Sequence, residues 1–384
     1  MTGDFSGDSY TEVTRQGWLS RVGGSLVGML VGFLLVPISI VVLYWNEGRA
    51  VDAIRSLDQG AKQTIEAGAN PSPGNDGKLV HVTGPLTTSS AARDPAFHIT
   101  APNLIRLHRQ VEMYQWEQQA SSSSHEEIGG SKTTETTYSY RKVWSEHEID
   151  STDFKKPAGH RNPEMPVKSG TYDGKNVRLG EYRLDPQVLS GLDQFKSISI
   201  EGADAPEDFK ASGNNLYSGR DPANPEIGDI RVSFTGVAAQ TASAVAGQSG
   251  NTLSPFTGEN GYTIALVKPG VASAAELFKA KKAEEGALTW ILRGVGFVMM
   301  LVALLLIASP LSTVLAVIPL FEWVAEAGIF AVALGVSVPL ALVVIAVAWI
   351  AHRPITGVLL LAVAAGAVFL VRNMRAKRAA PARA

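Results

Sequence analysis

The sequence contains no cysteine among its 384 residues. The absence of thiols excludes disulfide bonds, thiolate metal sites and cysteine nucleophiles. It also removes the usual indication of redox compartment, because disulfides persist only in oxidising environments. The compartment therefore has to be inferred from how the chain meets a membrane.

An excess of charge of one sign is also missing. Lysine and arginine together number 34, and aspartate and glutamate 36, which gives a formal net charge of −2. We therefore expect no global basic surface for nucleic acid and no acidic tail. The length suffices for two or three domains. The near-average composition conceals a strong segregation, because both ends of the chain are very apolar and the middle is polar.

Recognisable catalytic motifs are absent as well. The sequence has no phosphate-binding loop, no dinucleotide-binding glycine motif and no serine in a nucleophile elbow. His125 and His147, each followed by a glutamate, lack the second histidine that a zinc-binding helix requires four residues later. We expect no enzymatic activity, no cofactor and no metal ligands, and we interpret the histidines as structural or surface residues. An active site without a motif stays open, because Asp, Glu and His are plentiful.

What the sequence does contain is long apolar runs. Residues 22–45 include no charged residue, and about 20 apolar residues are enough to cross the hydrocarbon core of a bilayer. Pro37 lies within this run, which a membrane helix tolerates. A secretory signal peptide is the competing interpretation, but the run is too long and no small-residue cleavage site follows it. We therefore predict a first transmembrane helix over 22–45.

Small residues recur within this first run. Gly24, Gly28 and Gly32 are spaced by four residues, which places them on one face of a helix. Such a face allows two membrane helices to pack closely. The alternative is that small residues are simply common in membrane helices, and the sequence leaves both interpretations open.

The C-terminal third contains further apolar runs. We predict transmembrane helices over 288–309, 327–350 and 354–371. Only 351–353 separates the last two, so these should form an antiparallel hairpin in the membrane. Residues 310–326 hold two prolines, two glutamates and a tryptophan, and we interpret them as an interfacial connector.

Positively charged residues near the apolar runs predict the orientation. The tail 372–384 is basic, and Arg15 and Arg21 precede the first run. Because such residues mark cytoplasmic flanks, we expect 1–21 and the tail to be cytoplasmic. The predicted fold is a membrane protein with four transmembrane α-helices, one N-terminal and three C-terminal. A large β-rich α+β domain at 46–287 is inserted between helices 1 and 2 and is extracytoplasmic, either periplasmic or lumenal.

Aromatic side chains lie where the apolar runs meet this domain. Tyr44 and Trp45 end the first run, and Trp290 begins the second. Tyrosine and tryptophan settle in the headgroup layer of a bilayer. We therefore predict that these three residues are interfacial anchors.

Charged residues occur at the same outer ends of the predicted helices. Glu47 follows the first run, Arg293 lies about one turn inside the second helix, and Arg353 lies in the turn of the hairpin. A half-buried arginine is costly unless it pairs or extends to water. We predict that Glu47 pairs with Arg293 or Arg353 and clamps the first helix to the others. The alternative is that each side chain reaches water alone.

The polar middle of the chain has the alternation of apolar and polar residues that is typical of strands. Residues 104–119 and 137–149 alternate in this way, and the polar residues 120–136 lie between them. We predict a hairpin with a long loop over 120–136, in which the HEE sequence at 125–127 is a solvated charge run. Short helices are predicted near 185–195 and 272–285, and the second leads directly into the next apolar run.

Aromatic residues share one face of each strand of this predicted hairpin. Tyr114 and Trp116 lie on the first strand, and Tyr138, Tyr140 and Trp144 lie on the second. They could form a platform for a ligand, but aromatic pairs across neighbouring strands are ordinary sheet contacts. We favour the second interpretation.

Several long segments carry a family resemblance. These are NEGRA at 46–50, LVHVTGPLTTS at 79–89, RLHRQVEMYQWEQ at 106–118, PEIGDIRVSFTGV at 225–237 and LTWILRGVGF at 288–297. Together they resemble the transmembrane protein 43 family, known as LUMA. The resemblance implies four membrane helices with one large domain between the first and the second. For animal members it implies the endoplasmic reticulum and inner nuclear membrane, self-association, and a role in organising emerin and lamins, with no established enzymatic activity.

The richness in alanine and glycine, the short basic tail and the lack of cysteine favour a bacterial member, in which lamins do not exist. We therefore expect an integral membrane scaffold that self-associates and presents a large extracytoplasmic interaction domain. The alternatives are a channel or transporter component, and a membrane-anchored enzyme acting on lipid or cell-wall material. The expected partners are the lipid bilayer, further copies of the chain, and membrane or periplasmic proteins, but not nucleic acid. The expected location is the bacterial inner membrane, or the endoplasmic reticulum or inner nuclear membrane in a eukaryote.

Overall fold

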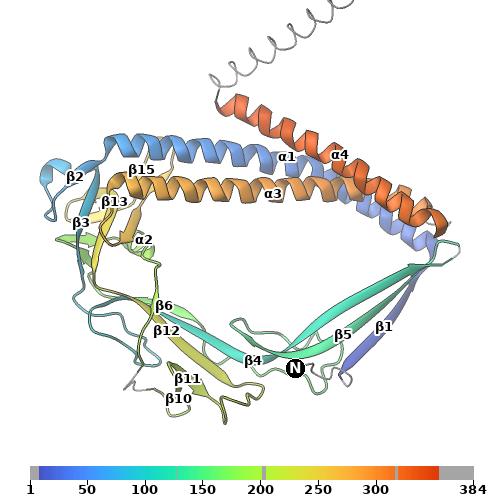
Figure 1. Cartoon of the computed structure of the whole chain (residues 1–384), viewed down its shortest axis with the longest axis horizontal. Helices are drawn as coiled ribbons and strands as arrows, with labels where there is room; N and C mark the ends of the chain where they lie inside the picture. Colours follow the sequence, from blue (N-terminus) through green and yellow to red (C-terminus); the bar gives the residue numbers. More distant parts are fainter. Residues whose placement is uncertain (1–7, 128, 201–204, 316–318, 354–384) are drawn as a thin grey trace, which may run out of the picture. The chain divides into compact units, whose positions relative to one another are not determined.

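A computed structural model describes residues 8–127, 129–200, 205–315 and 319–353 of the chain (Figure 1). These residues form two compact units, which are described separately. The β unit comprises the described residues of Met1–Thr14, Leu57–His125 and Thr133–Lys281. The helical unit comprises those of Arg15–Ser56, Glu126–Lys132 and Lys282–Ala384.

The larger sheet is built mainly from antiparallel strands that alternate buried and exposed side chains. Along β4, every second residue from Ile105 to Met113 is buried, as the two-residue repeat of a half-buried strand requires. The strands in spatial order are β1 (Ser9–Gln16), β5 (Lys132–Ser145), β4 (Leu104–Glu126), β12 (Ile230–Ala238), β11 (Asn215–Ser218) and β10 (Lys210–Ser212), while β6 (Gly170–Asp173) pairs with β4 and β9 (Lys196–Ser197) pairs with β12.

A second sheet contains shorter strands around the long pair β3 and β13. Its strands in spatial order are β17 (Leu266–Pro269), β13 (Thr241–Ser249), β14 (Thr252–Ser254), β8 (Tyr182–Leu184), β7 (Arg178–Leu179), β3 (Leu79–Thr87) and β2 (Ile65–Ala67), and β13 also pairs with β3. Three further short elements are the 3-10 turn η1 (Pro73–Asn75), the helix α2 (Pro186–Ser190) and the strand pair β15 (Phe256–Thr257) and β16 (Thr263–Ile264).

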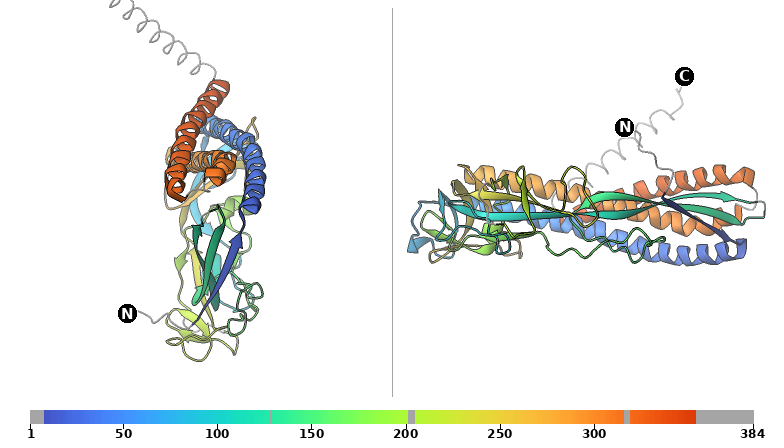
Figure 2. Two further views of the ribbon diagram at one scale, coloured as in Figure 1. Left: turned by 90° about the vertical axis from the view of Figure 1, so that its right-hand side faces the viewer. Right: turned by 90° about the horizontal axis from the view of Figure 1, so that it is seen from below.

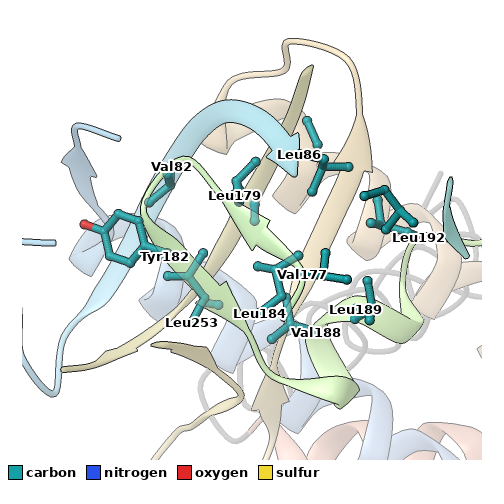
Figure 3. Close-up of a cluster of buried hydrophobic side chains, with 14 of the residues drawn as sticks. Val82, Leu86, Val177, Leu179, Tyr182, Leu184, Val188, Leu189, Leu192 and Leu253 are labelled. Atoms are coloured by element: carbon teal, nitrogen blue, oxygen red, sulfur yellow. The ribbon is translucent and has the colours of Figure 1, made fainter. Parts of the chain in front are cut away.

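The main core of the β unit lies against this second sheet. Apolar side chains from β3, β7, β8, β14 and α2 converge in it (Figure 3). Tyr182 is fully buried there, and its hydroxyl donates a hydrogen bond to the carbonyl of Asn70 at 3.2 Å. Asp185 begins α2 by accepting a hydrogen bond from the backbone N–H of Gln187, as a helix N-cap does. The predicted β-rich character of this domain is confirmed.

The predicted loop at 120–136 is wrong, because both strands of the hairpin continue into it. β4 extends to Glu126 and β5 begins at Lys132. Hydroxyl groups face one another across the two strands, with Ser122 and Thr136 at 2.9 Å and Ser124 and Thr134 at 2.8 Å. Cross-strand hydroxyl pairs of this kind stabilise a sheet, so a segment that looked like a solvated loop forms an extended hairpin.

Aromatic rings contact one another around this hairpin. The rings of Tyr114 and Trp144 have centroids 5.2 Å apart, as expected for a diagonal or direct cross-strand pair. The ring of His160 stacks on Tyr140 at 4.0 Å and meets Trp116 edge to face at 4.7 Å. The predicted aromatic ladder is thus part of the packing of the β unit.

Three helices of the described chain are long and apolar enough to cross a membrane. They are α1 (Trp18–Gln63), α3 (Ala274–Leu315) and the part of α4 (Pro319–His352) that begins at Ala327. These helices contain the predicted runs 22–45, 288–309 and 327–350, one before the β-rich domain and two after it. The predicted fourth helix at 354–371 and the basic tail at 372–384 lie outside the described residues.

The predicted interfacial connector at 310–326 is largely helical, and its interfacial location stays a prediction. α3 continues through Pro310 to Leu315, and α4 begins at Pro319. A proline inside a helix removes one backbone hydrogen bond, which membrane helices tolerate when hydroxyl groups compensate. Pro310 leaves the carbonyl of Leu306 without its backbone donor, and the hydroxyl of Ser309 donates to that carbonyl at 2.7 Å. Proline is also favourable as the first residue of a helix.

A buried ion pair in the β unit allows a test of its contribution to stability. The carboxylate of Asp94 is fully buried, and both of its oxygens lie 2.9 Å from Nη1 of Arg109. Replacing Asp94 by asparagine leaves the guanidinium without a countercharge, which should lower the free energy of unfolding by about 3–5 kcal/mol. The control is Glu181→Gln, which breaks an exposed pair with Arg178 and should cost at most about 1 kcal/mol. Thermal unfolding in detergent measures both, and equal melting of the two variants would contradict the prediction.

Candidate functional site

The helical unit contains a cluster of polar side chains on α1, α3 and α4. On α3 the contributing residues are spaced by four, which places them on one face of that helix. On α1 they follow directly after the aromatic pair Tyr44 and Trp45. We call this group the polar cluster, and its members are Asn46, Glu47, Arg49, Glu285, Thr289, Arg293 and Trp349.

A single carboxylate joins all three helices. Glu47 of α1 is only 2% exposed. Arg293 of α3 donates to its two oxygens from Nε at 2.6 Å and from Nη2 at 2.8 Å, which is the two-point geometry that makes arginine–carboxylate pairs strong. Trp349 of α4 donates from its indole N–H to the second oxygen at 2.7 Å. The negative charge of Glu47 is therefore fully paired.

A second set of contacts lies alongside this one and joins α1 to α3. Arg49 donates from Nη1 to the carboxylate of Glu285 at 2.5 Å and from Nη2 to the hydroxyl of Thr289 at 3.2 Å. Asn46, which is fully buried, donates to the backbone carbonyl of Thr289 at 3.1 Å. Within the described part of the chain, Oδ1 of Asn46, Nε of Arg49 and Nε2 of His352 are buried without a hydrogen-bond partner.

The structure brings Glu47 and Arg293 together but holds Arg353 differently. The guanidinium of Arg353 lies over the ring of Trp349, 4.9 Å from its centroid. Arg353 therefore stacks on the indole whose N–H binds Glu47. Sequence reasoning missed Trp349, Arg49 and Glu285. The four-residue spacing of Glu285, Thr289 and Arg293 was a signal that could have indicated a polar face on α3.

The predicted interfacial aromatics point outward from the helices. The exposed fractions are 40% for Tyr44, 57% for Trp45 and 71% for Trp290. The guanidinium of Arg293 lies 4.7 Å from the ring centroid of Trp290, and the ring of Tyr44 lies 5.1 Å from that of His352. Such exposed rings suit a headgroup layer, and the anchoring role stays a prediction.

The predicted glycine face contacts α3 over only part of its length. A methyl group on Gly32 would lie 2.6 Å from the carbonyl oxygen of Ala303, so only hydrogen fits there. At Gly28 the nearest atom, the hydroxyl of Ser309, would be at 3.5 Å, and at Gly24 nothing lies within 4 Å. Among these three glycines, the close approach to α3 is therefore concentrated at Gly32.

Within the helical unit, α1 and α3 run side by side in opposite directions (Figures 1 and 2). Arg49 contacts Glu285 near one end of this pairing. Trp18 donates from its indole N–H to the carbonyl of Thr313, at 3.4 Å, near the other end. The contacts between these ends follow the same antiparallel order, and they place Asn46 against Thr289, Leu43 against Gly296, Gly32 against Ala303 and Ser25 against Ser309. The polar cluster closes one end of a continuous two-helix contact.

Comparison with known proteins places these features in a family. The sequence model described as transmembrane protein 43 matches residues 113–354. Transmembrane protein 43 of Mus musculus is 32% identical over 387 residues, covering 97% of this chain and 95% of the relative. The Homo sapiens protein is 32% identical, covering 94% and 93%, and the Drosophila melanogaster homolog is 30% identical, covering 90% and 94%. No solved structure matches the chain.

Removing the charge of Glu47 tests whether the polar cluster holds the helices together. The variant Glu47→Gln leaves Arg293 without its countercharge in a buried place, and we expect a loss of about 3–5 kcal/mol in stability. The matched control is Arg55→Gln, which removes an exposed charge from the same helix. Thermal unfolding of the full chain in detergent is the measurement.

A double variant shows whether this loss comes from the unpaired charge. Glu47→Gln combined with Arg293→Gln removes both charges and should melt above Glu47→Gln alone, because no buried charge is left without a partner. If Glu47→Gln melts like the parent chain, the cluster does not fasten the helices.

The two glycines of α1 provide a matched pair of substitutions. Gly32→Ala forces a methyl group into the backbone of α3, and overpacking of this kind costs about 1–3 kcal/mol. Gly24→Ala enters open space and should be neutral or slightly stabilising, because alanine favours helix more than glycine does. The same detergent melts compare them, and a reversed order of stability would contradict the close contact at Gly32.

Proposed function

The chain belongs to the transmembrane protein 43 family of membrane proteins, and from this premise we propose that it is an integral membrane scaffold. It associates with copies of itself through its apolar helices and presents the β unit as an interaction domain. Its partners are lipid, further copies of the chain, and other membrane or envelope proteins, with no nucleic acid among them.

The observation that carries this proposal is the pairing of Glu47. Ionisable residues inside membrane helices usually mark ion paths, substrate paths or proton relays. Here the carboxylate accepts hydrogen bonds from Arg293 and from Trp349, and both come from other helices. Such an arrangement holds helices at fixed positions, which a scaffold needs, and it engages both oxygens of Glu47.

The surfaces of the described helices also favour a scaffold over a channel or an enzyme. The outward side chains of the stretch 22–45 of α1 are largely apolar and include Val27, Leu34 and Val41, so they suit lipid or another helix. A groove of about 360 Å³ on the helical unit is lined by apolar residues of α3 and α4, among them Leu304 and Val332. It offers no acid, base or nucleophile for a reaction. We therefore propose that the chain is not an enzyme.

The cellular location stays a prediction. Composition favours a bacterial inner membrane, and the family resemblance implies the endoplasmic reticulum or inner nuclear membrane for animal members. The relatives compared above come from animals. The extracytoplasmic placement of 46–287 likewise stays a prediction that rests on the flanking arginines.

Cysteine crosslinking in native membranes tests self-association directly. The chain has no cysteine of its own, so a disulfide-linked dimer can form only through introduced residues. Single cysteines at Val27, Leu34 and Val41 of α1 and at Val332 and Val343 of α4 sample exposed apolar positions. A specific assembly should give dimers at positions on one helix face and not at the others. Equal low crosslinking at every position, together with a monomeric mass in mild detergent, would overturn the proposal.

A further inference from the structure

The N-terminal strand β1 belongs to the larger sheet of the β unit. It pairs with β5, which pairs in turn with β4 and through it with β12 (Figure 1). The hydroxyls of Thr11 and Thr137 lie 3.2 Å apart, and Thr14 donates to the carbonyl of Thr134 at 3.4 Å. The residues before α1 are therefore part of a folded sheet.

Ion pairs attach the same segment to a second part of the β unit. Asp8 is hydrogen-bonded to the buried ring of His160 at 2.5 Å and accepts from Lys156 at 3.1 Å. Glu12 pairs with Lys155 at 3.1 Å. The hydrogen bond with His160 lowers the pKa of Asp8 below its ordinary value, so this carboxylate is charged at neutral pH. Residues 8–14 are thus bound to the β unit along their whole length.

The first turn of α1 is held by the tip of the β4–β5 hairpin. Arg21 pairs with the carboxylate of Glu126 and donates to the carbonyl of Gly130 at 2.8 Å. Arg15 pairs with Glu127. The HEE sequence at 125–127, predicted to be a solvated charge run, instead supplies the two carboxylates of this contact, and that of Glu126 is only 4% exposed.

These contacts restrict how α1 can meet a membrane. The chain leaves the β unit after Thr14 and returns to it at Leu57. Between these points α1 is one continuous helix. A polar, compact unit lies on one side of a bilayer, because its strands and charges cannot be accommodated in hydrocarbon. A helix that crossed the bilayer once would place 8–14 and the rest of the β unit on opposite sides, which would break the pairing of β1 with β5.

We propose that the apolar stretch 22–45 of α1 lies along the bilayer within one leaflet, with residues 8–21 and the β unit on the same side. Half of a hydrocarbon core about 30 Å thick can accommodate a helix about 10–12 Å across. The exposed side chains around this stretch are apolar, and they include Val27, Leu30, Phe33, Leu34, Ile38 and Val41. Its surface therefore fits the acyl chains of a single leaflet.

The apolar part of α3 follows the same course. It begins beside Glu285, which binds Arg49, and ends near Thr313, which binds Trp18. Both ends of the apolar part of α3 therefore contact residues of α1 that flank the stretch 22–45. This arrangement differs from the orientation predicted from flanking arginines, which separated 1–21 from 46–287 by the membrane.

A double-cysteine variant tests the pairing of β1 in the membrane. Thr11→Cys with Thr137→Cys places two thiols on facing residues whose hydroxyl oxygens lie 3.2 Å apart, which favours a disulfide between them. The control, Thr11→Cys with Lys210→Cys, places the second thiol on β10 at the far end of the strand order. Mild oxidation of the full chain in native membranes should link the first pair and not the second. Equal linkage of the two variants, or none in either, would overturn the proposal.

Accessibility of single cysteines tests the sidedness independently. Ser9→Cys and Thr11→Cys report on β1, and Lys210→Cys reports on an exposed position of the β unit. A membrane-impermeant maleimide is applied to sealed vesicles. If the β unit faces outward, the reagent should label all three variants. If the β unit faces the vesicle interior, the reagent should label none of them until the vesicles are opened. Two positions in β1 are used so that the result does not depend on a single substitution that disturbs the strand. Labelling of Lys210→Cys alone, or of the β1 variants alone, in sealed vesicles would show that α1 crosses the bilayer.

Discussion

The carboxylate of Glu47 is the point on which the helical unit depends. It is buried on a helix whose neighbouring surface is apolar, and an unpaired charge there would be very costly. Arg293 and Trp349 remove that cost by binding it from two other helices. Because each donor comes from a different part of the chain, the pairing fixes the positions of α1, α3 and α4 together.

The contact between α1 and α3 extends from this point through small and hydroxyl-bearing residues. Gly32 permits the backbone of α3 to approach, and Ser25 and Ser309 meet further along. In lipid, such close contacts replace the hydrophobic effect as the source of helix association. At the far end Arg21 binds the hairpin tip through Glu126 and Gly130.

The sequence was most informative where local composition imposes a physical requirement. Apolar length indicated the three described helices, and a charge in an apolar context suggested a partner for Glu47. It was least informative where partners are distant in the chain. The Ser-rich segment at 120–126 looked like a loop because its strand pairing depends on hydroxyls of β5. β1 was not predicted, because its partner strand lies more than a hundred residues away, and Trp349 carried no local sign that its indole would bind Glu47.

The central claim is that the Glu47 carboxylate and the Arg293 guanidinium are in direct contact within a lipid bilayer. Solid-state NMR of the full chain in lipid can measure the dipolar coupling between the carboxyl carbon of Glu47 and the guanidinium nitrogens of Arg293. Nitrogen–oxygen distances of 2.6 and 2.8 Å predict a measurable coupling to both nitrogens that face the carboxylate. The absence of any such coupling in a folded, bilayer-embedded sample would contradict this account of the helical unit.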